Sequence, residues 1–304
     1  IQRAIFLGLF SSFDRRTNEA MKAPTVIIVI LNWNGADLLI DCLDSVREID
    51  YPNYEILVVD NGSTDNSVVV IQKNYPDVKI LQLPENRGYA RGNNAGFSHA
   101  KNWGDFIVIL NNDTTVDKQL LNDLIKPFKD NSSIIQTAPK IYYADQPDLI
   151  WYAGGYVNLW LGIINHVGIR KKDEKKYLVE INTDYATGCC FCMRMRDYEK
   201  FKGFNETFEM YGEDVNLSLM IRNTGGQVRM IPTAKIWHKV SASSGGSGSI
   251  SRLLKRLRSN FRIMYARATI FQWITFVISL PVLLIYYIYR FFIVKYSSYQ
   301  SSSE

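Results

Sequence analysis

The chain has 304 residues, with 35 Lys or Arg against 30 Asp or Glu and a formal net charge of +5. This length gives room for one α/β domain of about 200 to 250 residues and an appendage. No second Cys or His cluster accompanies the cysteines at positions 189, 190 and 192, which argues against a zinc site. We expect Cys42, Cys189, Cys190 and Cys192 to be small buried residues of a reducing cytosol.

The first 22 residues carry little structural signal. The run 5–10 is apolar but too short to span a membrane, and Arg3 gives only a thin likeness to a signal peptide. Met21 lies just before the first expected strand and is a candidate natural start. We treat residues 1–22 as an N-terminal extension without an assigned function.

The first apolar run covers residues 24–31 and reads as a strand. It ends in the turn-forming sequence NWNG, residues 32–35, which contains Asn32 and Asn34. A helical pattern follows over residues 36–48. This segment therefore predicts a strand, a polar turn and a helix in succession.

The second run, residues 56–59, reads as a fully buried strand that ends at Asp60. The turn residues 61–62 follow, and Thr64 or Asp65 can cap the next helix. Asp60 is therefore expected at the carboxyl end of a strand, where open α/β sheets bind ligands.

The same arrangement recurs twice more. Residues 78–83 form a third strand that leads into Asn86 and Arg87, and residues 106–110 form a fourth that leads into Asn111 and Asp113. Strands alternating with helices predict βαβ units and a parallel sheet. One edge of that sheet is then expected to collect a ligand site built from Asn32, Asp60, Asn86, Arg87, Asn111 and Asp113.

Seven sequence motifs, taken together, resemble the inverting family-two glycosyltransferases of GT-A fold, and within them the rhamnosyltransferase-type members. The resemblance covers roughly Pro24 to Ser244. The motifs are NWNG (32–35), DNGSTD (60–65), NRGYARGNNAG (86–96), LNNDT (110–114), TGCCFCMRM (187–195), GFNETFEMYGEDVNLSLMIRNTGG (203–226) and PTAKIWHKVSASSG (232–245). The implied fold is an α/β GT-A domain over residues 23–245, with a mostly parallel central sheet flanked by helices.

The implied activity moves a sugar, rhamnose among the candidates, from a nucleotide-sugar donor to a saccharide or lipid-linked saccharide in cell-surface polysaccharide synthesis. In the family the second acid of the pair Glu213-Asp214 deprotonates the acceptor, so Asp214 is the expected base. Glu213 would orient it or hydrogen-bond the acceptor. The family often has a further Asp where this chain has Asn216, so the interaction that orients Asp214 or binds the acceptor is expected to be weaker. A single base without a covalent nucleophile implies inversion.

The resemblance also implies a donor and metal site. Asp60 is expected to contact the nucleoside, with Asn32, Asn34, Asn86, Arg87 and Asn111 as further donor-binding residues. Asp113 would hold Mg²⁺ or Mn²⁺ against the diphosphate, with His238 as a second ligand. The family's DxD appears here as Asn111-Asn112-Asp113, so one carboxylate is missing and metal affinity is expected to be lower.

The C-terminal segment, residues 246–304, differs sharply in charge from the rest. After Asp214 no carboxylate side chain appears until Glu304, while the same stretch carries twelve Lys or Arg. A Gly/Ser stretch, 241–251, is read as a loop or linker. Residues 252–267 predict a basic amphipathic helix suited to an anionic membrane surface, at the cytoplasmic face of the cell membrane.

Next come 22 residues without formal charge, 268–289, long enough to span a bilayer core of about 30 Å. Lying on the membrane is the other membrane-bound possibility. The alternative is a helical pair that folds back onto the catalytic domain. Nucleic-acid binding is not supported, because no aromatic platform or helix-turn-helix pattern accompanies the basic charge.

Three other functional classes remain as alternatives. A sugar nucleotidyltransferase should show a Gly-rich loop with a basic residue after the first strand, and NWNG has none. A non-catalytic, membrane-attached sugar-binding protein would explain the sequence NND, but retention of Glu213, Asp214 and His238 argues against it. A dinucleotide-binding dehydrogenase should carry GxGxxG after the first strand, which is lacking here. The donor, the acceptor and the oligomeric state stay open.

Overall fold

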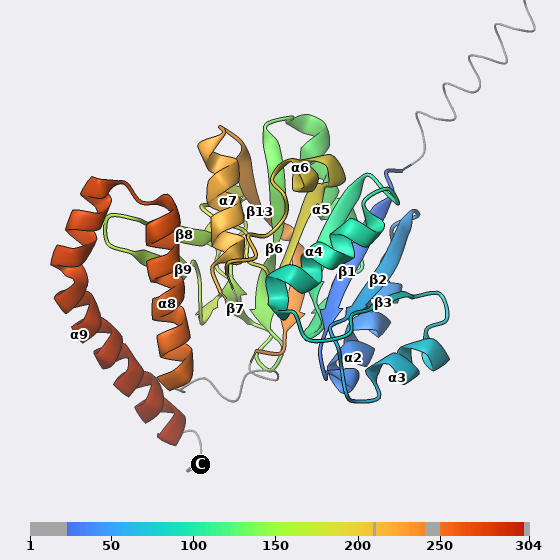
Figure 1. Ribbon diagram of the computed structural model, residues 1–304, viewed down its shortest axis with the longest axis horizontal. Helices are drawn as coiled ribbons and strands as arrows, with labels where there is room; N and C mark the ends of the chain where they lie inside the picture. The colour runs from blue at the N-terminus through green and yellow to red at the C-terminus, as the bar shows by residue number, and fades with distance from the viewer. Residues whose placement is uncertain (1–22, 209–210, 241–249, 301–304) are drawn as a thin grey trace, which may run out of the picture.

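The computed structural model describes residues 23–208, 211–240 and 250–300 (Figure 1). The predicted extension, residues 1–22, and residues 241–249 of the Gly/Ser stretch lie outside the described residues. All four predicted strands of the first half are present: β1 (Val26–Asn32), β2 (Tyr54–Asp60), β3 (Lys79–Gln82) and β4 (Phe106–Asn111). They are parallel and lie in the order β3, β2, β1, β4.

Three helices connect these strands: α2 (Ala36–Arg47), α3 (Ser67–Asn74) and α4 (Gly88–Ala100). α4 packs directly on β1 and β2. Gly96 allows this close approach, since a Cβ there would lie 2.7 Å from methyl carbons of Val29 and Val59. The first five residues of β1 are fully buried, as a strand covered on both faces requires.

The second half of the chain makes the sheet mixed. β12 (Cys190–Arg194) runs antiparallel between β4 and β6 (Ile134–Tyr143), and β13 (Gln227–His238) runs parallel to β6. The sheet also contains β5 (Thr114–Val116), β7 (Leu149–Tyr152), β10 (Lys171–Lys172) and β11 (Ile181–Asn182). The predicted α/β fold is confirmed, as a mixed and largely parallel sheet flanked by helices.

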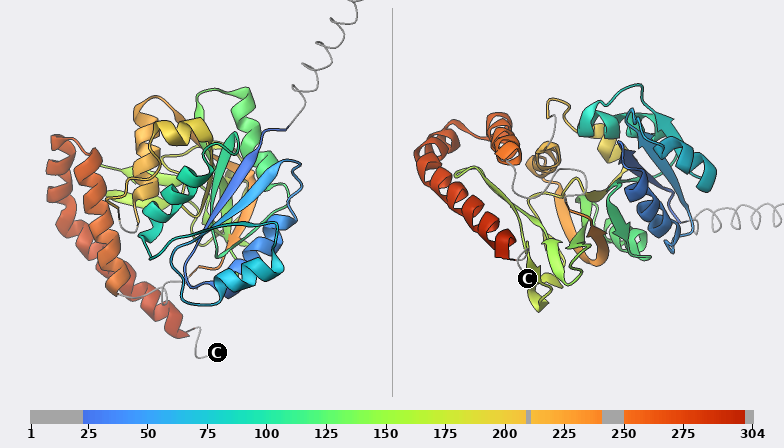
Figure 2. Two further views of the ribbon diagram at one scale, coloured as in Figure 1. Left: turned by 45° about the vertical axis from the view of Figure 1, so that its right-hand side comes forward. Right: turned by 90° about the horizontal axis from the view of Figure 1, so that it is seen from below.

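The remaining elements of this half are α5 (Leu120–Asp130), α6 (Met195–Lys200), α7 (Glu213–Asn223) and a short 3-10 helix (Lys175–Tyr177). α5 covers β6 and β13. A separate hairpin of β8 (Gly155–Asn158) and β9 (Ile163–His166) projects from the sheet toward the C-terminal helices (Figure 2). All four cysteines are buried free thiols, as predicted.

The C-terminal segment forms two helices, α8 (Ile250–Arg267) and α9 (Ile270–Gln300), which run in opposite directions (Figure 1). α8 packs against α7, with Ile263 and Met264 almost fully buried. The pair therefore folds back onto the catalytic half, as one of the sequence-based alternatives proposed. Within the residues that the structure describes, no helix is both long and apolar enough to cross a membrane.

Candidate active site

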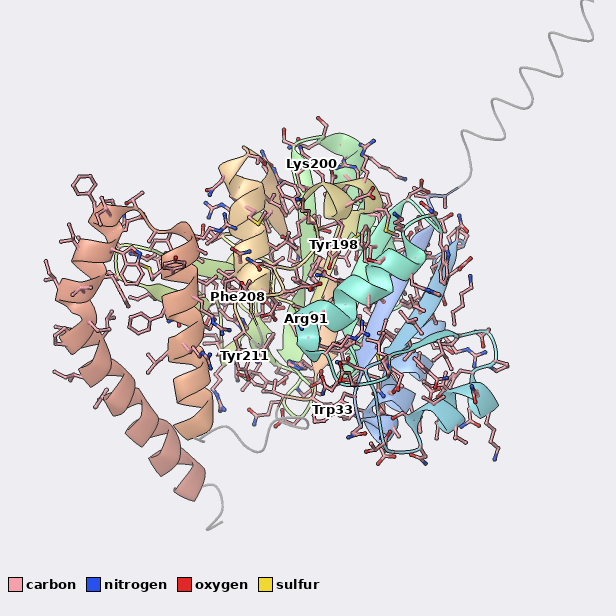
Figure 3. The ribbon with its side chains drawn as sticks, in the orientation of Figure 1. Trp33, Arg91, Tyr198, Lys200, Phe208 and Tyr211 are labelled. Atoms are coloured by element: carbon pink, nitrogen blue, oxygen red, sulfur yellow. The ribbon has the colours of Figure 1, made fainter. Side chains whose placement is uncertain are left out.

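The carboxyl ends of the parallel strands bring the predicted polar residues to one edge of the sheet. Asn32 lies opposite Asp60 in the β1–β2 register, and Asn111 lies opposite Leu31 in the β1–β4 register. In Figure 3, Trp33, just after β1, lies below Arg91, which is near the start of α4. The strand ends therefore form one continuous edge.

Asp60 is the best-placed ligand group on this edge. It is 3% exposed, and its Oδ2 accepts a hydrogen bond from the Ser63 backbone N–H at 3.1 Å. Its Oδ1 is buried without a hydrogen-bond partner in the described part of the protein. Buried carboxylate oxygens are nearly always paired in folded proteins, so this atom is available for a donor group of a ligand.

Asn32 and Asn34 hydrogen-bond neighbouring loops. Asn32 Oδ1 accepts from Asn112 Nδ2 at 2.8 Å, which ties the end of β1 to the end of β4. Asn34 Oδ1 accepts from the Thr64 backbone N–H at 2.7 Å, which ties the first turn to the second. Both side chains therefore shape the site through its loops.

Asn86 and Arg87 are joined to the β2 turn through Asn61. Asn61 Nδ2 donates to Asn86 Oδ1 at 3.0 Å, and the Arg87 backbone N–H donates to Asn61 Oδ1 at 2.9 Å. The Arg87 side chain is exposed at the start of α4. Asn61 therefore holds the backbone of Arg87 beside the turn that follows Asp60. The sequence analysis did not select Asn61, although it lies inside the DNGSTD motif.

Asp113 and His238 meet because β5 pairs with β13. Thr114 lies opposite His238 in that register, and Asp113 Oδ1 lies 3.2 Å from His238 Nε2. Both residues are less than a tenth exposed, and Asp113 Oδ1 has no hydrogen-bond partner among the described residues. The Trp151 ring packs edge-on against the imidazole, at 4.6 Å between centroids. The sequence-predicted pair is therefore close together and oriented by its surroundings.

The oxygen and nitrogen atoms that Asp113 and His238 present suit a divalent cation. A carboxylate oxygen and an imidazole nitrogen face each other, and the carboxylate oxygen lacks a competing hydrogen bond. Among the described residues, no group of three or more His, Cys, Asp or Glu converges on one point. Asp113 and His238 can thus supply two ligands, and the others would come from a bound ligand or water.

Glu213 and Asp214 begin α7, directly after two residues with left-handed backbone. Tyr211 has φ of 68° and Gly212 has φ of 95°. Asp214 Oδ2 accepts from the Gly188 N–H and its Oδ1 from the Val215 N–H, both at 2.8 Å. Such backbone donors favour the ionised carboxylate and fix its orientation.

Glu213 differs from its neighbour. It is 6% exposed, and its Oε2 is buried without a partner among the described residues. Burial, and then the adjacent Asp214 carboxyl, raises the pKa of Glu213 to about 8. Burial also raises the pKa of Asp214, against its backbone hydrogen bonds. The pKa of both carboxyls is therefore raised, and Asp214 differs in that several backbone hydrogen bonds oppose the rise.

Two consecutive residues, Gly188 and Cys189, connect the Glu213-Asp214 pair to the sheet edge at the carboxyl ends of β1, β2 and β4 (the predicted donor edge). The Gly188 N–H binds Asp214, and the carbonyl of Cys189 accepts from the Asn111 N–H at 2.9 Å. Asp214 is therefore separated from the end of β4 by a single backbone segment. The predicted base is therefore linked to Asn111, one of the predicted donor-binding residues.

One further residue near the acid pair was missed by sequence reasoning. Tyr89, on α4, donates its hydroxyl to the Gly188 carbonyl at 2.5 Å, so Gly188 is held from both sides. Burial first, and then the Glu213 and Asp214 carboxyls, raise the pKa of Tyr89 well above its usual range. Tyr89 lies within the NRGYARGNNAG motif, but only the fold shows that it reaches the acid pair.

α8 contacts the turn that precedes the acid pair. Ser259 Oγ donates to the Tyr211 carbonyl at 2.8 Å, and a Cβ on Gly212 would lie 2.5 Å from that hydroxyl. Arg267 Nε donates to Oδ1 of the buried Asn216 at 2.7 Å. The C-terminal helix is thus part of the scaffold of the site, and Asn216 is a hydrogen-bond acceptor for it.

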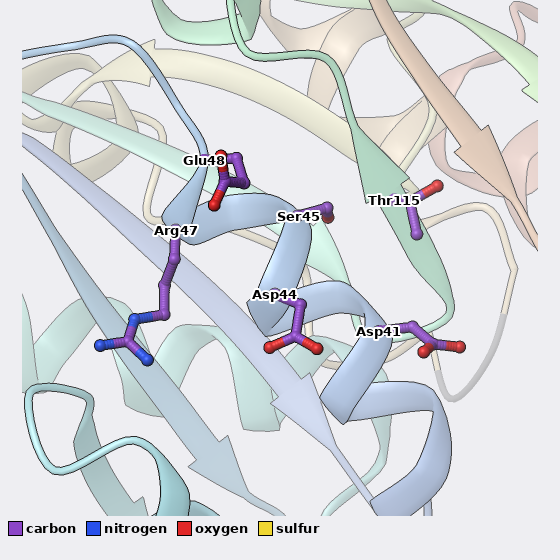
Figure 4. A pocket seen from close by; sticks show the side chains of 6 residues that line it. All are labelled: Asp41, Asp44, Ser45, Arg47, Glu48 and Thr115. Carbon is purple, nitrogen blue, oxygen red and sulfur yellow. The ribbon is translucent and has the colours of Figure 1, made fainter.

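A separate hollow beside α2 is unsuited to the same chemistry (Figure 4). Carboxylates dominate its lining, which consists of Asp41, Asp44, Ser45, Arg47, Glu48 and Thr115. Asp41 is already paired with Lys239. An anionic diphosphate would be repelled by this surface.

The comparison with known families decides the class. The family described as Glycosyl transferase family 2 matches residues 25–202, more than half of the chain. The chain belongs to glycosyl transferase family 2. The matched region contains the donor edge, whereas Glu213, Asp214 and His238 lie beyond it.

Curated relatives of this glycosyltransferase come from bacterial polysaccharide synthesis. The poly-beta-1,6-N-acetyl-D-glucosamine synthase of Staphylococcus epidermidis is 29% identical over 120 residues, which cover 38% of this chain and 28% of that protein. The O-antigen biosynthesis protein RfbC of Myxococcus xanthus is 25% identical over 230 residues, covering 72% of this chain and 18% of that protein. The chain thus spans less than a third of either relative.

Solved structures share the GT-A-like fold at low sequence identity. GalNAc-T7 with UDP, GalNAc and Mn²⁺ has a TM-score of 0.63 and 18% identity, with 79% of this chain and 48% of that chain covered. A mannosyltransferase from Pyrobaculum calidifontis, in complex with GDP-Man and Mn²⁺, has a TM-score of 0.58 and 18% identity, with 87% and 75% covered.

Proposed function

We propose that this glycosyltransferase is an inverting, metal-dependent hexosyltransferase. It moves a sugar from a nucleoside-diphosphate donor to a saccharide or polyprenyl-linked saccharide acceptor in cell-surface polysaccharide synthesis. The observation that carries the proposal is the backbone bridge of Gly188 and Cys189, which joins Asp214 to the donor edge at Asn111. An acceptor next to Asp214 would thereby lie next to a donor bound at the strand ends.

In the proposed reaction, the acceptor hydroxyl gives its proton to Asp214 while its oxygen bonds to the anomeric carbon. The bond from that carbon to the diphosphate oxygen breaks, and the nucleoside diphosphate leaves with the electron pair. Displacement by the acceptor itself inverts the anomeric centre. Glu213, kept protonated by burial, would donate a hydrogen bond to the acceptor or to Asp214.

The donor would be held at the strand ends. Asp60 Oδ1, which lacks a partner among the described residues, is placed to accept from a base N–H or a ribose hydroxyl. Arg87, exposed at the start of α4, can approach the diphosphate, while Asn86 holds the loop that carries it. Asn32 and Asn34 keep the first turn in place, and Asn111 lies at the junction of donor and acceptor.

Asp113 and His238 would hold Mg²⁺ or Mn²⁺, since their facing oxygen and nitrogen atoms fit a cation. When bound, the cation supplies charge relief to the departing diphosphate. Solved structures of similar fold contain Mn²⁺, which supports this assignment. Two protein ligands in place of three or more are consistent with a site completed by the donor's phosphate oxygens.

The C-terminal helices are proposed to hold the enzyme at the cytoplasmic face of the cell membrane. The basic charge after Asp214 suits anionic lipid, and the outer face of α9 exposes large apolar side chains. A polyprenyl-linked acceptor would be presented at the same surface. Lying along the membrane is the mode that we propose, with α8 docked on α7.

A donor panel tests the proposed activity. The purified chain would be incubated with Mn²⁺ and UDP-, GDP- or TDP-linked sugars, TDP-rhamnose included because of the motif resemblance, and released nucleoside diphosphate would be measured. We expect release from one nucleotide class, increased by acceptor. Binding of a donor without any release, with and without membrane extract as an acceptor source, would favour the non-catalytic binding protein instead.

A further inference from the structure

The β8–β9 hairpin is docked onto the C-terminal helices by its tip. Thr275 Oγ1, on α9, donates to the Trp160 carbonyl at 2.9 Å, and Asn260 Nδ2, on α8, donates to the Gly162 carbonyl at 3.2 Å. The ring of Phe276, which is 3% exposed, occupies the position that a Cβ on Gly162 would take. Figures 1 and 2 show the hairpin reaching between the two helices. Its backbone is therefore held firmly.

Two large apolar side chains at this tip are nevertheless exposed. Trp160 is 52% exposed and Leu161 is 38% exposed. The backbone N–H of each donates to Asn158 Oδ1, at 3.0 and 3.2 Å. A tip that is fixed by main-chain and side-chain bonds thus presents a Trp-Leu pair outward.

The outer face of α9 continues this apolar surface. Its exposed apolar residues recur every three or four positions, as one helical stripe requires, with exposed fractions between 51% and 73%. They are Ile270, Phe271, Ile274, Val277, Ile278, Val282, Ile285 and Tyr289. Thr275, which binds the Trp160 carbonyl, lies on the same side of the helix as Phe271 and Ile278. The hairpin tip is thereby adjacent to the stripe.

The charge of the surroundings selects the occupant. The segment that forms α8 and α9, residues 250–300, contains no carboxylate side chain and eight Lys or Arg, whereas the stretch between Arg267 and Arg290 carries no formal charge. A second copy of this chain would bring the same excess of positive charge to a shared interface. An anionic lipid surface offers opposite charge at its headgroups and an apolar layer beneath, where Trp is favoured.

We propose that the β8–β9 hairpin tip and the outer face of α9 form one surface that lies in the interfacial layer of an anionic bilayer, with Trp160 and Leu161 inserted. The inference rests on the proposed membrane association of α8 and α9. It adds a contact from the catalytic domain itself, because β8 and β9 belong to residues inside that domain. Two points of contact fix the orientation of the active site relative to the membrane.

A site-specific fluorophore tests the insertion. Trp160→Cys would be labelled with nitrobenzoxadiazole, which is selective because the four native thiols are buried. Val69→Cys, labelled in the same way, is the control: Val69 is 64% exposed on α3, and α3 lies on the opposite side of the molecule from α9 in Figure 1. With vesicles of phosphatidylglycerol and phosphatidylcholine, we expect the probe at position 160 to brighten and shift to the blue, and the probe at position 69 to stay unchanged.

Vesicle affinity supplies the second measurement. Trp160→Ser with Leu161→Ser should weaken binding about tenfold or more, because two large apolar side chains are lost from the interfacial layer. Leu178→Ser with Val179→Ser, a pair that is 57% and 60% exposed before β11, should change it little. Nucleoside diphosphate release in vesicle-free buffer should stay at the wild-type rate in both variants, which separates this inference from the proposed activity.

Three outcomes would overturn the inference. If the wild-type chain does not bind anionic vesicles, both the membrane association of α8 and α9 and the hairpin contact are wrong. If the Trp160/Leu161 variant binds vesicles as tightly as the wild type, the proposed hairpin contact is wrong and the contact of α9 is unaffected. A blue shift that occurs without vesicles, in step with dimer formation in light scattering, assigns the surface to a second copy of the chain.

Discussion

At the scale of single residues, Glu213 and Asp214 share a helix start but have different surroundings. Both carboxylate oxygens of Asp214 accept backbone N–H bonds, from Gly188 and Val215. Glu213 Oε2 has no partner among the described residues and lies in a buried position. Two adjacent acids held in unlike environments can divide the roles of base and hydrogen-bond donor.

The raised pKa of Glu213 predicts a pH dependence of stability. Between about pH 4.5 and pH 8 the folded chain holds a proton that the unfolded chain has lost, so the free energy of unfolding falls as pH rises. Glu213→Gln cannot ionise, and its melting temperature relative to wild type should increase from pH 5 to pH 9. Each tenfold difference in proton affinity between the folded and unfolded chains corresponds to about 1.4 kcal/mol. Equal pH dependence of both proteins in calorimetry would show that Glu213 is ionised when folded.

The metal pair gives a second prediction at this scale. Asp113→Asn and His238→Gln should each raise the Mn²⁺ concentration for half-maximal binding by about tenfold or more, because each removes one of two protein ligands. Manganese binding would be followed by electron paramagnetic resonance in the presence of nucleoside diphosphate, and turnover in parallel. Turnover that survives EDTA undiminished would leave Asp113 as a hydrogen-bonding residue only.

At the scale of elements, α8 acts on the turn that begins α7. Tyr211 is a non-glycine residue with φ of 68°, a conformation that needs support from its surroundings. The Ser259 hydroxyl binds the carbonyl of Tyr211 and is itself 5% exposed. The C-terminal helix therefore helps to set the orientation of the acid pair.

Loss of that hydroxyl should affect turnover more than donor binding. Ser259→Ala is expected to lower kcat about three- to tenfold, the value of one hydrogen bond, with the KM for donor unchanged. Ser259→Thr should restore part of the activity because it keeps the hydroxyl. Ser279→Ala is the matched control, since that hydroxyl binds the Phe276 carbonyl of its own helix. A parallel loss of kcat in both alanine variants would point to a general effect on the tail.

The sequence predicts the donor edge well, because the carboxyl ends of parallel strands must meet. Asn32 and Asp60 become neighbours through strand register alone. The contact of Asp113 with His238 depends on the pairing of β5 with β13, which lie far apart in the chain, and no local periodicity encodes such a partner. Only the family resemblance suggested it.

Other features depend on packing that a residue pattern does not determine. The antiparallel insertion of β12 between β4 and β6 makes the sheet mixed, yet the run 190–194 reads simply as an apolar strand. Tyr89 lies in a recognised motif, but its reach to Gly188 follows from how α4 sits on the sheet. The contact between α8 and α7 likewise depends on tertiary packing between segments of the chain.

At the scale of the whole molecule, the tail is both scaffold and proposed membrane contact. Removing residues 252–304 would expose the part of α7 that α8 packs against, so a deletion would mix two effects. Substitutions on the outer face of α9 avoid this problem. Ile274 and Ile278 are 51% and 73% exposed and lie away from α7.

Ile274→Glu combined with Ile278→Glu should weaken sedimentation with anionic vesicles about tenfold or more, because two apolar contacts are replaced by two negative charges. Val69→Glu, on the exposed surface of α3, is the control and should leave vesicle binding close to wild type. Retention of full vesicle affinity by the α9 variant would place the membrane contact elsewhere.

The central claim is that Asp214 is the base of an inverting sugar transfer, and one substitution tests it most directly. Asp214→Asn preserves the size of the side chain and one of the two oxygens that accept backbone N–H bonds, but it cannot accept the proton. With the donor identified by the panel, we predict unchanged donor affinity in calorimetry, a melting temperature close to wild type and turnover lowered by about 10² or more. Transfer by Asp214→Asn at a rate near wild type, with a folded protein and normal donor affinity, would contradict the account.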